Sequence, residues 1–315
     1  MKRLSICLVG GSGFIGQALC AALIRDGHAV RVVTRGMRLP PNLAVLPGIE
    51  VVRGNPYRAA LLRMAFAKQD VVIHLVGILN EAGRDGSGFE RAHVTLTREV
   101  VSACRAAHVP RLLHMSALHA NEQGPSHYLR TKALAERVVR EESGEVAWTI
   151  FQPSVVFGRG DSFINRFASL LQWLPVLPLA RAEARFAPVG IDDVVAAFLR
   201  ALQDPKTIHE TYQLCGPEVF TLRQLVHYVG QLLGLRRWVV GLPDWAGRLQ
   251  AALLDFVPGK PLSSDNFKSL TVDSVCTENG FARLNLVPAA LREVVPTYLG
   301  AAQRAARLAR WRQTR

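Results

Sequence analysis

The chain has 315 residues, of which 49% are hydrophobic and 20% are charged, and its formal net charge is +13. This composition is typical of a globular protein and excludes a largely disordered chain, while the length favours one large domain with an appended lobe. The positive charge indicates an anionic partner, such as a nucleotide, nucleic acid or an acidic lipid surface.

The chain carries no recognisable signal for export or for crossing a membrane. A glycine cluster interrupts the first apolar stretch too early for a signal peptide, and Pro175 and Pro178 break the apolar segment 167–180. The five cysteines are widely spaced, with neither CxxC pairs nor a disulfide framework, so we expect a reducing compartment. The expected location is the cytoplasm, with peripheral attachment to the inner face of the cytoplasmic membrane as an open alternative.

The first half of the chain alternates short apolar segments with helical ones. The expected strands are nearly continuous in hydrophobicity, as in strands buried on both faces, and cover residues 4–9, 29–34, 49–52, 70–76, 111–116 and 146–151. The expected helices lie between them at residues 14–25, 57–67, 89–107 and 128–142. This alternation predicts the α/β class, with a Rossmann-type doubly wound parallel sheet.

The rhythm changes after residue 151, where prolines become frequent. Helices are expected around residues 192–202, 221–233 and 243–256, with one more strand at 211–215. We therefore predict a Rossmann domain at residues 1–155, with sheet contributions from about 185–215. Residues 156–315 are expected to form a smaller, mainly helical lobe for substrate or partners, ending in a basic helix.

The stretch "CLVGGSGFIG", residues 7–16, contains the first candidate functional motif. Gly10, Gly13 and Gly16 follow an apolar strand and begin a helix, which is the setting of a dinucleotide fingerprint. Glycine allows the tight turn and the close approach of a pyrophosphate, and the helix N-terminus supplies N–H donors. Their GxxGxxG spacing is the variant found in short-chain dehydrogenases and reductases.

The end of the second strand bears on the choice of dinucleotide. Thr34 and Arg35 stand where an NAD-selective site usually has an acid, and a guanidinium suits a phosphate. We therefore expect NADP(H), with NAD(H) as the second choice, although Arg35 could also be a solvated surface charge. Asn55 could contact the adenine or simply occupy a turn.

The segment "HYLRTKALAE" places Tyr128 and Lys132 on one face of a helix, one turn apart. A nearby ammonium stabilises a phenolate, which would bring the tyrosine pKa towards neutrality and allow proton transfer to or from a carbonyl or alcohol. Ser116, at the end of the fifth strand, is expected to hydrogen-bond the same substrate oxygen. We predict these three residues as the catalytic group.

The chain resembles an atypical extended short-chain dehydrogenase/reductase of the NAD-dependent epimerase/dehydratase type. More closely, it resembles the family of the NADPH-binding accessory subunit of mitochondrial respiratory complex I and its bacterial relatives. The resemblance covers roughly residues 5–200 and is carried by "GGSGFIG", "HLVGIL", "SALHA", "SHYLRTKALAE", "QPSVVFGRGDSFINRFASL" and "FAPVGIDDVVAAF".

The resemblance implies further contacts with the cofactor. The pyrophosphate turn would be lined by Ser12, Phe14 and Ile15. The loop beside the adenosine half would contribute Leu75, Val76 and Gly77, and Pro153 and Ser154 would flank the nicotinamide. Tyr128 and Lys132 would also hold the nicotinamide ribose. Arg159 and Asp161 would lie near the substrate, unless they form only a charged turn before a helix.

One departure affects the prediction of an enzyme. Ordinary extended reductases have about two dozen residues between the active-site serine and tyrosine, whereas twelve positions separate Ser116 from Tyr128. The complex I subunit family shares this short loop and is thought to use its nucleotide structurally. The leading hypothesis is a reductase of a hydrophobic carbonyl or quinone-related compound. The alternatives are an NADPH-stabilised subunit or assembly protein of a membrane complex, and a sugar-nucleotide epimerase or dehydratase.

The remaining features indicate partners more than chemistry. Trp173, Trp238 and Trp245 lie in strongly apolar segments that suggest core packing, a greasy substrate or contact with lipid. The terminal segment 301–315 has five arginines and no acid, which suits a solvated helix, a membrane surface or a docked protein. A nucleic-acid partner is disfavoured because no nucleic-acid-binding motif accompanies the charge. Metal binding is not expected from the numerous histidines, which lack ligand spacing.

Overall fold

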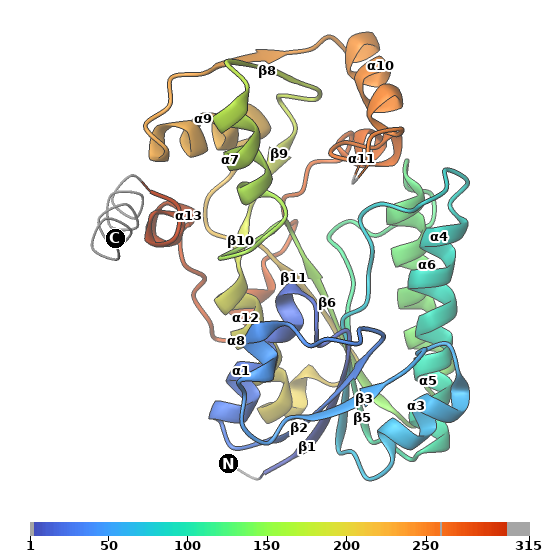
Figure 1. Ribbon diagram of the computed structural model, residues 1–315. Coiled ribbons are helices and arrows are strands. Elements are labelled where there is room, and N and C mark those ends of the chain that lie inside the picture. Colours follow the sequence, from blue (N-terminus) through green and yellow to red (C-terminus); the bar gives the residue numbers. More distant parts are fainter. Residues whose placement is uncertain (1–2, 259, 301–315) are drawn as a thin grey trace. The chain divides into compact units, whose positions relative to one another are not determined.

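The computed structural model describes residues 3–258 and 260–300 (Figure 1). The chain forms two compact units. Unit 1 comprises the chain up to Pro153 together with Val194–Leu214 and Glu278–Leu286, and unit 2 comprises Ser154–Asp193, Cys215–Thr277 and the described residues from Val287 onward. The predicted basic helix at the C-terminus lies outside the described residues.

Unit 1 is built on a parallel sheet. Within the described residues the sheet has seven strands in the order β11-β6-β5-β4-β1-β2-β3. Their bounds are β1 Ser5–Val9, β2 Ala29–Thr34, β3 Glu50–Arg53, β4 Val71–His74, β5 Arg111–Met115, β6 Ala147–Pro153 and β11 Glu210–Leu214. Each pairs in parallel with its neighbours, so the carboxyl ends of the strands meet at one edge. The predicted α/β Rossmann-type sheet is confirmed.

Helices cover both faces of this sheet, with α3, α5 and α6 on one side and α1 and α8 on the other (Figure 1). The bounds are α1 Phe14–Arg25, α2 Pro41–Ala44, α3 Ala59–Phe66, α4 Ser87–Phe89, α5 Leu96–Ala106, α6 His127–Glu142, α8 Ile191–Gln203 and α12 Gly280–Arg283. The helix expected at 89–107 is interrupted, because Glu90–Thr95 is a π-helical segment between α4 and α5.

The core of unit 1 lies between the sheet and the helices on the α3 side. Val72, Leu112 and Ile150 come from three adjacent strands, and Phe66 and Val139 come from α3 and α6; all five are buried in one apolar cluster. Such burial is the main favourable contribution to folding. It also fixes α6 against the sheet, and α6 carries the predicted Tyr128 and Lys132.

Unit 2 mixes short strands with longer helices. Its strands form three pairs within the described residues: β7 Val156–Phe157 with β10 Val189–Gly190, β8 Val176–Leu179 with β13 Trp238–Gly241, and β9 Arg185–Phe186 with β12 Phe220–Thr221. Its helices are α7 Ile164–Trp173, α9 Leu222–Leu232, α10 Asp244–Leu254, α11 Ser264–Ser269 and α13 Leu291–Val294. Strands of two to four residues are too short to show a period in the sequence.

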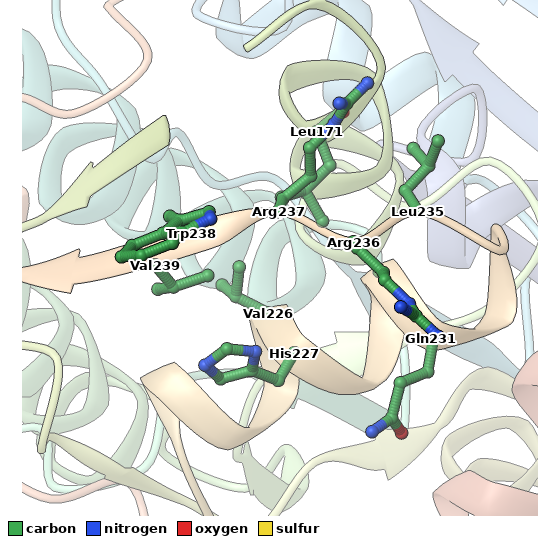
Figure 2. A pocket seen from close by; sticks show the side chains of 10 residues that line it. Leu171, Val226, His227, Gln231, Leu235, Arg236, Arg237, Trp238 and Val239 are labelled. Atoms are coloured by element: carbon green, nitrogen blue, oxygen red, sulfur yellow. The ribbon is translucent and has the colours of Figure 1, made fainter. Parts of the chain in front are cut away.

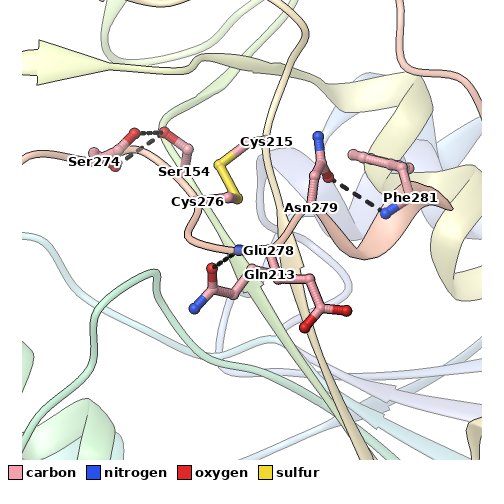
Figure 3. Close-up of a disulfide and its surroundings, with 8 residues drawn as sticks. All are labelled: Ser154, Gln213, Cys215, Ser274, Cys276, Glu278, Asn279 and Phe281. Carbon is pink, nitrogen blue, oxygen red and sulfur yellow. Dashed lines mark hydrogen bonds between the residues drawn. A yellow bond between two sulfur atoms is a disulfide. The ribbon is translucent and has the colours of Figure 1, made fainter. Parts of the chain in front are cut away.

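A disulfide joins Cys215 to Cys276 within unit 2 (Figure 3). The wide spacing of the five cysteines predicts no disulfide framework, and this prediction is wrong because Cys215 and Cys276 pair although they stand 61 positions apart. Folding brings them together. The other three cysteines, Cys7, Cys20 and Cys104, are free and buried.

The prediction that the chain does not cross a membrane can be compared with the length and hydrophobicity of its helices. Among the residues that the structure describes, no helix combines the length and the hydrophobicity needed to cross a bilayer.

Candidate nucleotide and catalytic site

The glycine turn between β1 and α1 has the geometry of a phosphate-binding turn. Gly10 has a φ of +93°, which side chains disfavour, and its carbonyl accepts a hydrogen bond from the Gly13 amide at 3.0 Å. A Cβ at Gly16 would lie only 2.5 Å from the Gly10 carbonyl oxygen. In the described structure no side chain caps the N-terminus of α1, which begins at Phe14. Ser12 lies on this turn, and Phe14 and Ile15 are the first two residues of α1.

The end of β2 lies beside the glycine turn. The hydroxyls of Ser12 and Thr34 are 3.3 Å apart, and the Gly36 amide donates to the Thr34 hydroxyl at 3.1 Å. Arg35 is exposed immediately after the strand. A cationic side chain thus stands in the position where NAD-selective proteins have an acid.

Asn55 follows β3 and is exposed. Its side-chain oxygen accepts a hydrogen bond from the Tyr57 amide at 3.1 Å. This hydrogen bond is that of a local turn, which is one of the two interpretations of Asn55.

The loop after β4 connects the glycine turn to α6. Leu75 donates its amide to the Val9 carbonyl at 2.9 Å, and a Cβ at Gly10 would lie 3.1 Å from the Val76 amide nitrogen. A Cβ at Gly77 would lie 3.1 Å from Lys132 Nζ. The loop therefore approaches the predicted phosphate turn at one end and the predicted catalytic lysine at the other.

Tyr128 and Lys132 lie one turn apart on α6, whose N-terminus is capped by the Ser126 hydroxyl. Lys132 is buried, and its ammonium donates to the Met115 carbonyl at 3.1 Å. Burial lowers the pKa of Lys132 to about 8, although the charge of Glu136 opposes this shift.

The Tyr128 ring lies edge-on to two aromatic neighbours, Phe89 and His93, with centroid distances of 6.2 and 5.6 Å. Burial raises the pKa of Tyr128 to about 12. The expected shift towards neutrality is therefore wrong for this state of the protein, because loss of hydration disfavours the phenolate. The phenol is consequently protonated at neutral pH.

Ser116 belongs to a buried polar cluster around Glu136. Its hydroxyl donates to Glu136 Oε1 at 2.5 Å, and the Gln152 side-chain amide donates to the same oxygen at 2.7 Å. Arg140 donates to the other carboxylate oxygen at 2.7 Å. The Ser116 hydroxyl is thus held by a carboxylate two helical turns beyond Tyr128, a placement that the sequence did not suggest.

His93 lies beside the candidate site, although nothing in the sequence singles it out. The Ile78 amide donates to its Nε2 at 3.1 Å, so Nε2 is unprotonated and Nδ1 carries the hydrogen that faces the Thr131 hydroxyl at 2.8 Å. Burial lowers the pKa of His93 to about 2. His93 therefore links the loop after β4 to α6 as a neutral side chain. His93 belongs to the π-helical segment Glu90–Thr95, and no pattern in the sequence predicts that segment.

Two other buried histidines lie on the same side of the sheet. His74 on β4 and His114 on β5 are paired in register, with ring centroids 5.2 Å apart. Burial lowers the pKa of His74 to about 3 and that of His114 well below its usual value. Among the described residues, no group of histidines, cysteines and carboxylates has the arrangement of a metal site.

The remaining predicted residues fall in both units. Pro153 ends β6 in unit 1, and its carbonyl accepts a hydrogen bond from the Leu118 amide at 3.0 Å. Ser154 begins unit 2, where its hydroxyl contacts the carbonyl and hydroxyl oxygens of Ser274 at 2.8 and 2.9 Å (Figure 3). Asp161 accepts the Ile164 amide at 2.6 Å at the start of α7, as a helix-capping residue does. Arg159 is exposed.

The glycine turn, the loop after β4 and α6 together fit a nicotinamide dinucleotide. The turn leaves room that a Cβ at Gly10 or Gly16 would fill, and the amides of α1 can receive a pyrophosphate. Lys132 lies beside Gly77, and Tyr128 precedes it by one turn of α6. All of these residues belong to unit 1.

Comparison with known proteins agrees with this arrangement. Residues 6–215 match the NAD dependent epimerase/dehydratase family. The chain is 31% identical over 302 residues to NADH dehydrogenase [ubiquinone] 1 alpha subcomplex subunit 9, mitochondrial, of Arabidopsis thaliana, covering 90% of this chain and 74% of that protein. It is 26% identical to a ceramide reductase of Caulobacter vibrioides (79% and 77% covered) and 32% identical to a 2-alkyl-3-oxoalkanoate reductase of Stenotrophomonas maltophilia (74% and 77% covered).

Solved structures show the same fold. The structure of MoeE5 in complex with UDP-glucuronic acid and NAD has a TM-score of 0.76 with 19% identity, covering 96% of this chain and 99% of that one. The resemblance drawn from the glycine turn and the Tyr128–Lys132 segment is confirmed by the relatives in sequence. The chain belongs to the NAD dependent epimerase/dehydratase family.

Proposed function

We propose that the protein is an NADP(H)-dependent reductase of a hydrophobic carbonyl or quinone-related compound. The observation that carries the proposal is the position of Tyr128 and Lys132 on α6, beside a loop that also abuts the glycine turn. Two relatives are named as reductases, of ceramide and of 2-alkyl-3-oxoalkanoate, and both names describe molecules with alkyl chains. These names support an apolar carbonyl as substrate.

The proposed cofactor contacts follow from the turn and its neighbours. Bound NADPH would supply a hydride to the substrate carbon. The residues proposed to hold the dinucleotide are Gly10, Ser12, Gly13, Phe14, Ile15, Gly16, Thr34, Arg35, Asn55, Leu75, Val76, Gly77, Tyr128, Lys132, Pro153 and Ser154. Arg35 supports NADP(H) over NAD(H), because its guanidinium would meet the extra phosphate and no acid follows β2.

In the proposed reaction Tyr128 is the proton donor. Its raised pKa keeps the phenol protonated, so the hydroxyl can transfer its proton to the carbonyl oxygen as negative charge develops there. The Lys132 ammonium would stabilise the phenolate that remains, and the Met115 carbonyl orients this ammonium. Ser116 donates its hydroxyl hydrogen to Glu136, whose charge acts on Lys132. We therefore propose that Ser116 influences the Lys132 ammonium through this carboxylate.

A single-turnover measurement tests the reductase. The protein is loaded with NADPH and mixed in a stopped-flow instrument with a 2-alkyl-3-oxo ester, a short-chain quinone or a UDP-sugar, and nicotinamide absorbance is followed. We expect oxidation by one of the apolar compounds, and Tyr128→Phe should slow it by about 100-fold or more. Equal rates for the two proteins would remove Tyr128 from the mechanism. Turnover of the UDP-sugar alone would favour the epimerase or dehydratase alternative.

The second candidate function is an NADPH-stabilised subunit or assembly protein of a membrane complex. It is favoured by the 31% identity with a subunit of mitochondrial NADH dehydrogenase and by the engagement of Ser116 with Glu136. Tightly bound NADPH that copurifies in stoichiometric amount, and that none of the compounds oxidises, would support this role. For either function we propose a cytoplasmic location, with peripheral attachment to the inner face of the cytoplasmic membrane as the alternative.

A further inference from the structure

Unit 2 exposes large apolar side chains on neighbouring elements, since β8 pairs with β13 and α10 contacts β8. Trp173, Trp238 and Trp245 are 84%, 76% and 71% exposed, and Leu253, Leu249 and Val176 are between 47% and 61% exposed. These six residues are called the apolar face below. In unit 1, by contrast, the exposed large apolar residues are scattered among different elements, as in Met37, Met64 and Ile208.

The strand pair β8–β13 forms the first part of the apolar face. Trp238 pairs with Val176 and Val240 pairs with Pro178 in parallel register. The alternate residues Leu177, Leu179 and Val239 are buried in the core of unit 2. Because side chains alternate across a strand, the pair has one buried side and one exposed apolar side. Two residues separate Trp173, at the end of α7, from the start of β8.

Helix α10 forms the second part and lies next to β8. Its Gln250 side chain donates to the Pro178 carbonyl at 3.0 Å, and Ala251 is buried with Ala180 and Phe267. This contact uses one side of the helix. Trp245, Leu249 and Leu253 follow each other at intervals of four, so they form a single exposed stripe on α10.

Cations border the apolar face. A pocket of about 270 Å³ between α7, α9 and β13 is lined by Arg236, Arg237 and Trp238, and Figure 2 shows Arg236 extending towards Gln231. The acidic group at the start of α10 is already paired, since Asp244 contacts Arg181 at 2.7 Å and Arg248 at 3.0 Å. The border of the face therefore presents positive charge, on a chain whose net charge is +13.

We propose that the apolar face of unit 2 binds the surface of an anionic lipid bilayer. Indole side chains favour the interface between headgroups and acyl chains, an exposed helical stripe of leucines inserts shallowly, and arginines attract acidic headgroups. A second copy of the chain is disfavoured as the occupant, because two copies that each carry a net charge of +13 repel each other. This inference rests on the proposed attachment to the membrane and names the face that makes it, and its test does not depend on turnover of NADPH.

Vesicle flotation with the full-length protein tests the proposal. The vesicles contain phosphatidylcholine alone or phosphatidylcholine mixed with phosphatidylglycerol. We expect binding to the mixed vesicles, weakened by salt, and a partition coefficient at least about tenfold lower for L249S/L253S. The matched control is M64S/V287S, which removes two exposed apolar side chains outside the face and should bind like the unmodified protein. Thermal unfolding of each variant checks that it is folded.

Three outcomes would overturn the proposal. The first is equal vesicle binding by L249S/L253S and the control variant. The second is loss of binding in R304Q/R307Q/R310Q, which alters only the basic terminal segment, together with full retention in L249S/L253S. The third is absence of vesicle binding with concentration-dependent dimers that L249S/L253S abolishes in sedimentation equilibrium, which would assign the face to a second copy.

Discussion

Glu136 is the residue whose charge most directly faces the proposed catalytic lysine. It lies one helical turn beyond Lys132 and is buried, with Ser116, Gln152 and Arg140 as hydrogen-bond donors. Its negative charge raises the pKa of Lys132 against the lowering effect of burial. Its role would therefore be that of a positioning and charge-setting residue rather than a catalytic one.

Replacing this charge should change the pH dependence of the reaction. In Glu136→Gln, the pKa of Lys132 should fall below about 8, because burial then acts unopposed. Loss of the ammonium on raising the pH should therefore begin earlier, and the alkaline limb of the single-turnover profile should shift down by roughly one pH unit. Glu141→Gln, at an exposed position near the end of the same helix, is the control. Superimposable profiles for the two variants would refute the role of Glu136.

Arg35 is the residue on which the choice of NADP(H) rests. Arg35→Glu removes the proposed phosphate ligand and introduces an acid where NAD-selective proteins have one. The ratio of NADPH to NADH affinity, measured by fluorescence titration, should fall by about 10- to 100-fold. Arg25→Glu makes the same charge change at the other end of α1 and should leave the ratio unaltered. An unchanged ratio in Arg35→Glu would mean that this side chain is only a surface charge.

At the scale of elements, the sequence predicts those helices and strands that are long enough to show a regular hydrophobic pattern. All seven strands of the main sheet and the long helices α1, α3, α6, α8, α9 and α10 correspond to segments with clear hydrophobic patterns. The three strand pairs of unit 2 are only two to four residues long, and the π-helical segment Glu90–Thr95 has no distinctive composition, so neither could be predicted.

The candidate site shows the same division. The glycine turn and the Tyr128–Lys132 pair are local motifs, and local spacing is visible in a sequence. The contacts of Ser116 with Glu136 and of His93 with Ile78 join different elements, and they depend on how α6 and the π-helical segment lie against β5 and the loop after β4. No spacing rule encodes such contacts.

At the scale of the whole molecule, the Cys215–Cys276 bond closes a loop of 61 positions in unit 2. A crosslink of this span restricts the unfolded chain, so Cys276→Ser should lower the free energy of unfolding by about 2–4 kcal/mol. Urea titration followed by circular dichroism measures the change, and the same titration of unmodified protein in reducing buffer should give a similar loss. Cys20→Ala, at a buried free thiol, controls for cysteine replacement itself. Equal stability of reduced and oxidised protein would show that the bond contributes nothing.

The strand β11 carries a consequence for dissecting the protein. It pairs along β6 from Thr149 to Pro153, yet it is encoded some sixty positions later, after a long stretch that belongs to unit 2. A fragment stopping at Pro153 would therefore leave the backbone N–H and C=O groups along one side of β6 without a neighbour, on a strand rich in apolar residues. An unpaired strand edge of this kind can form β-sheet hydrogen bonds with other molecules, which leads to aggregation. A nucleotide-binding fragment made by simple truncation should thus precipitate, whereas one that splices Val194–Leu214 back through a short linker should stay in solution.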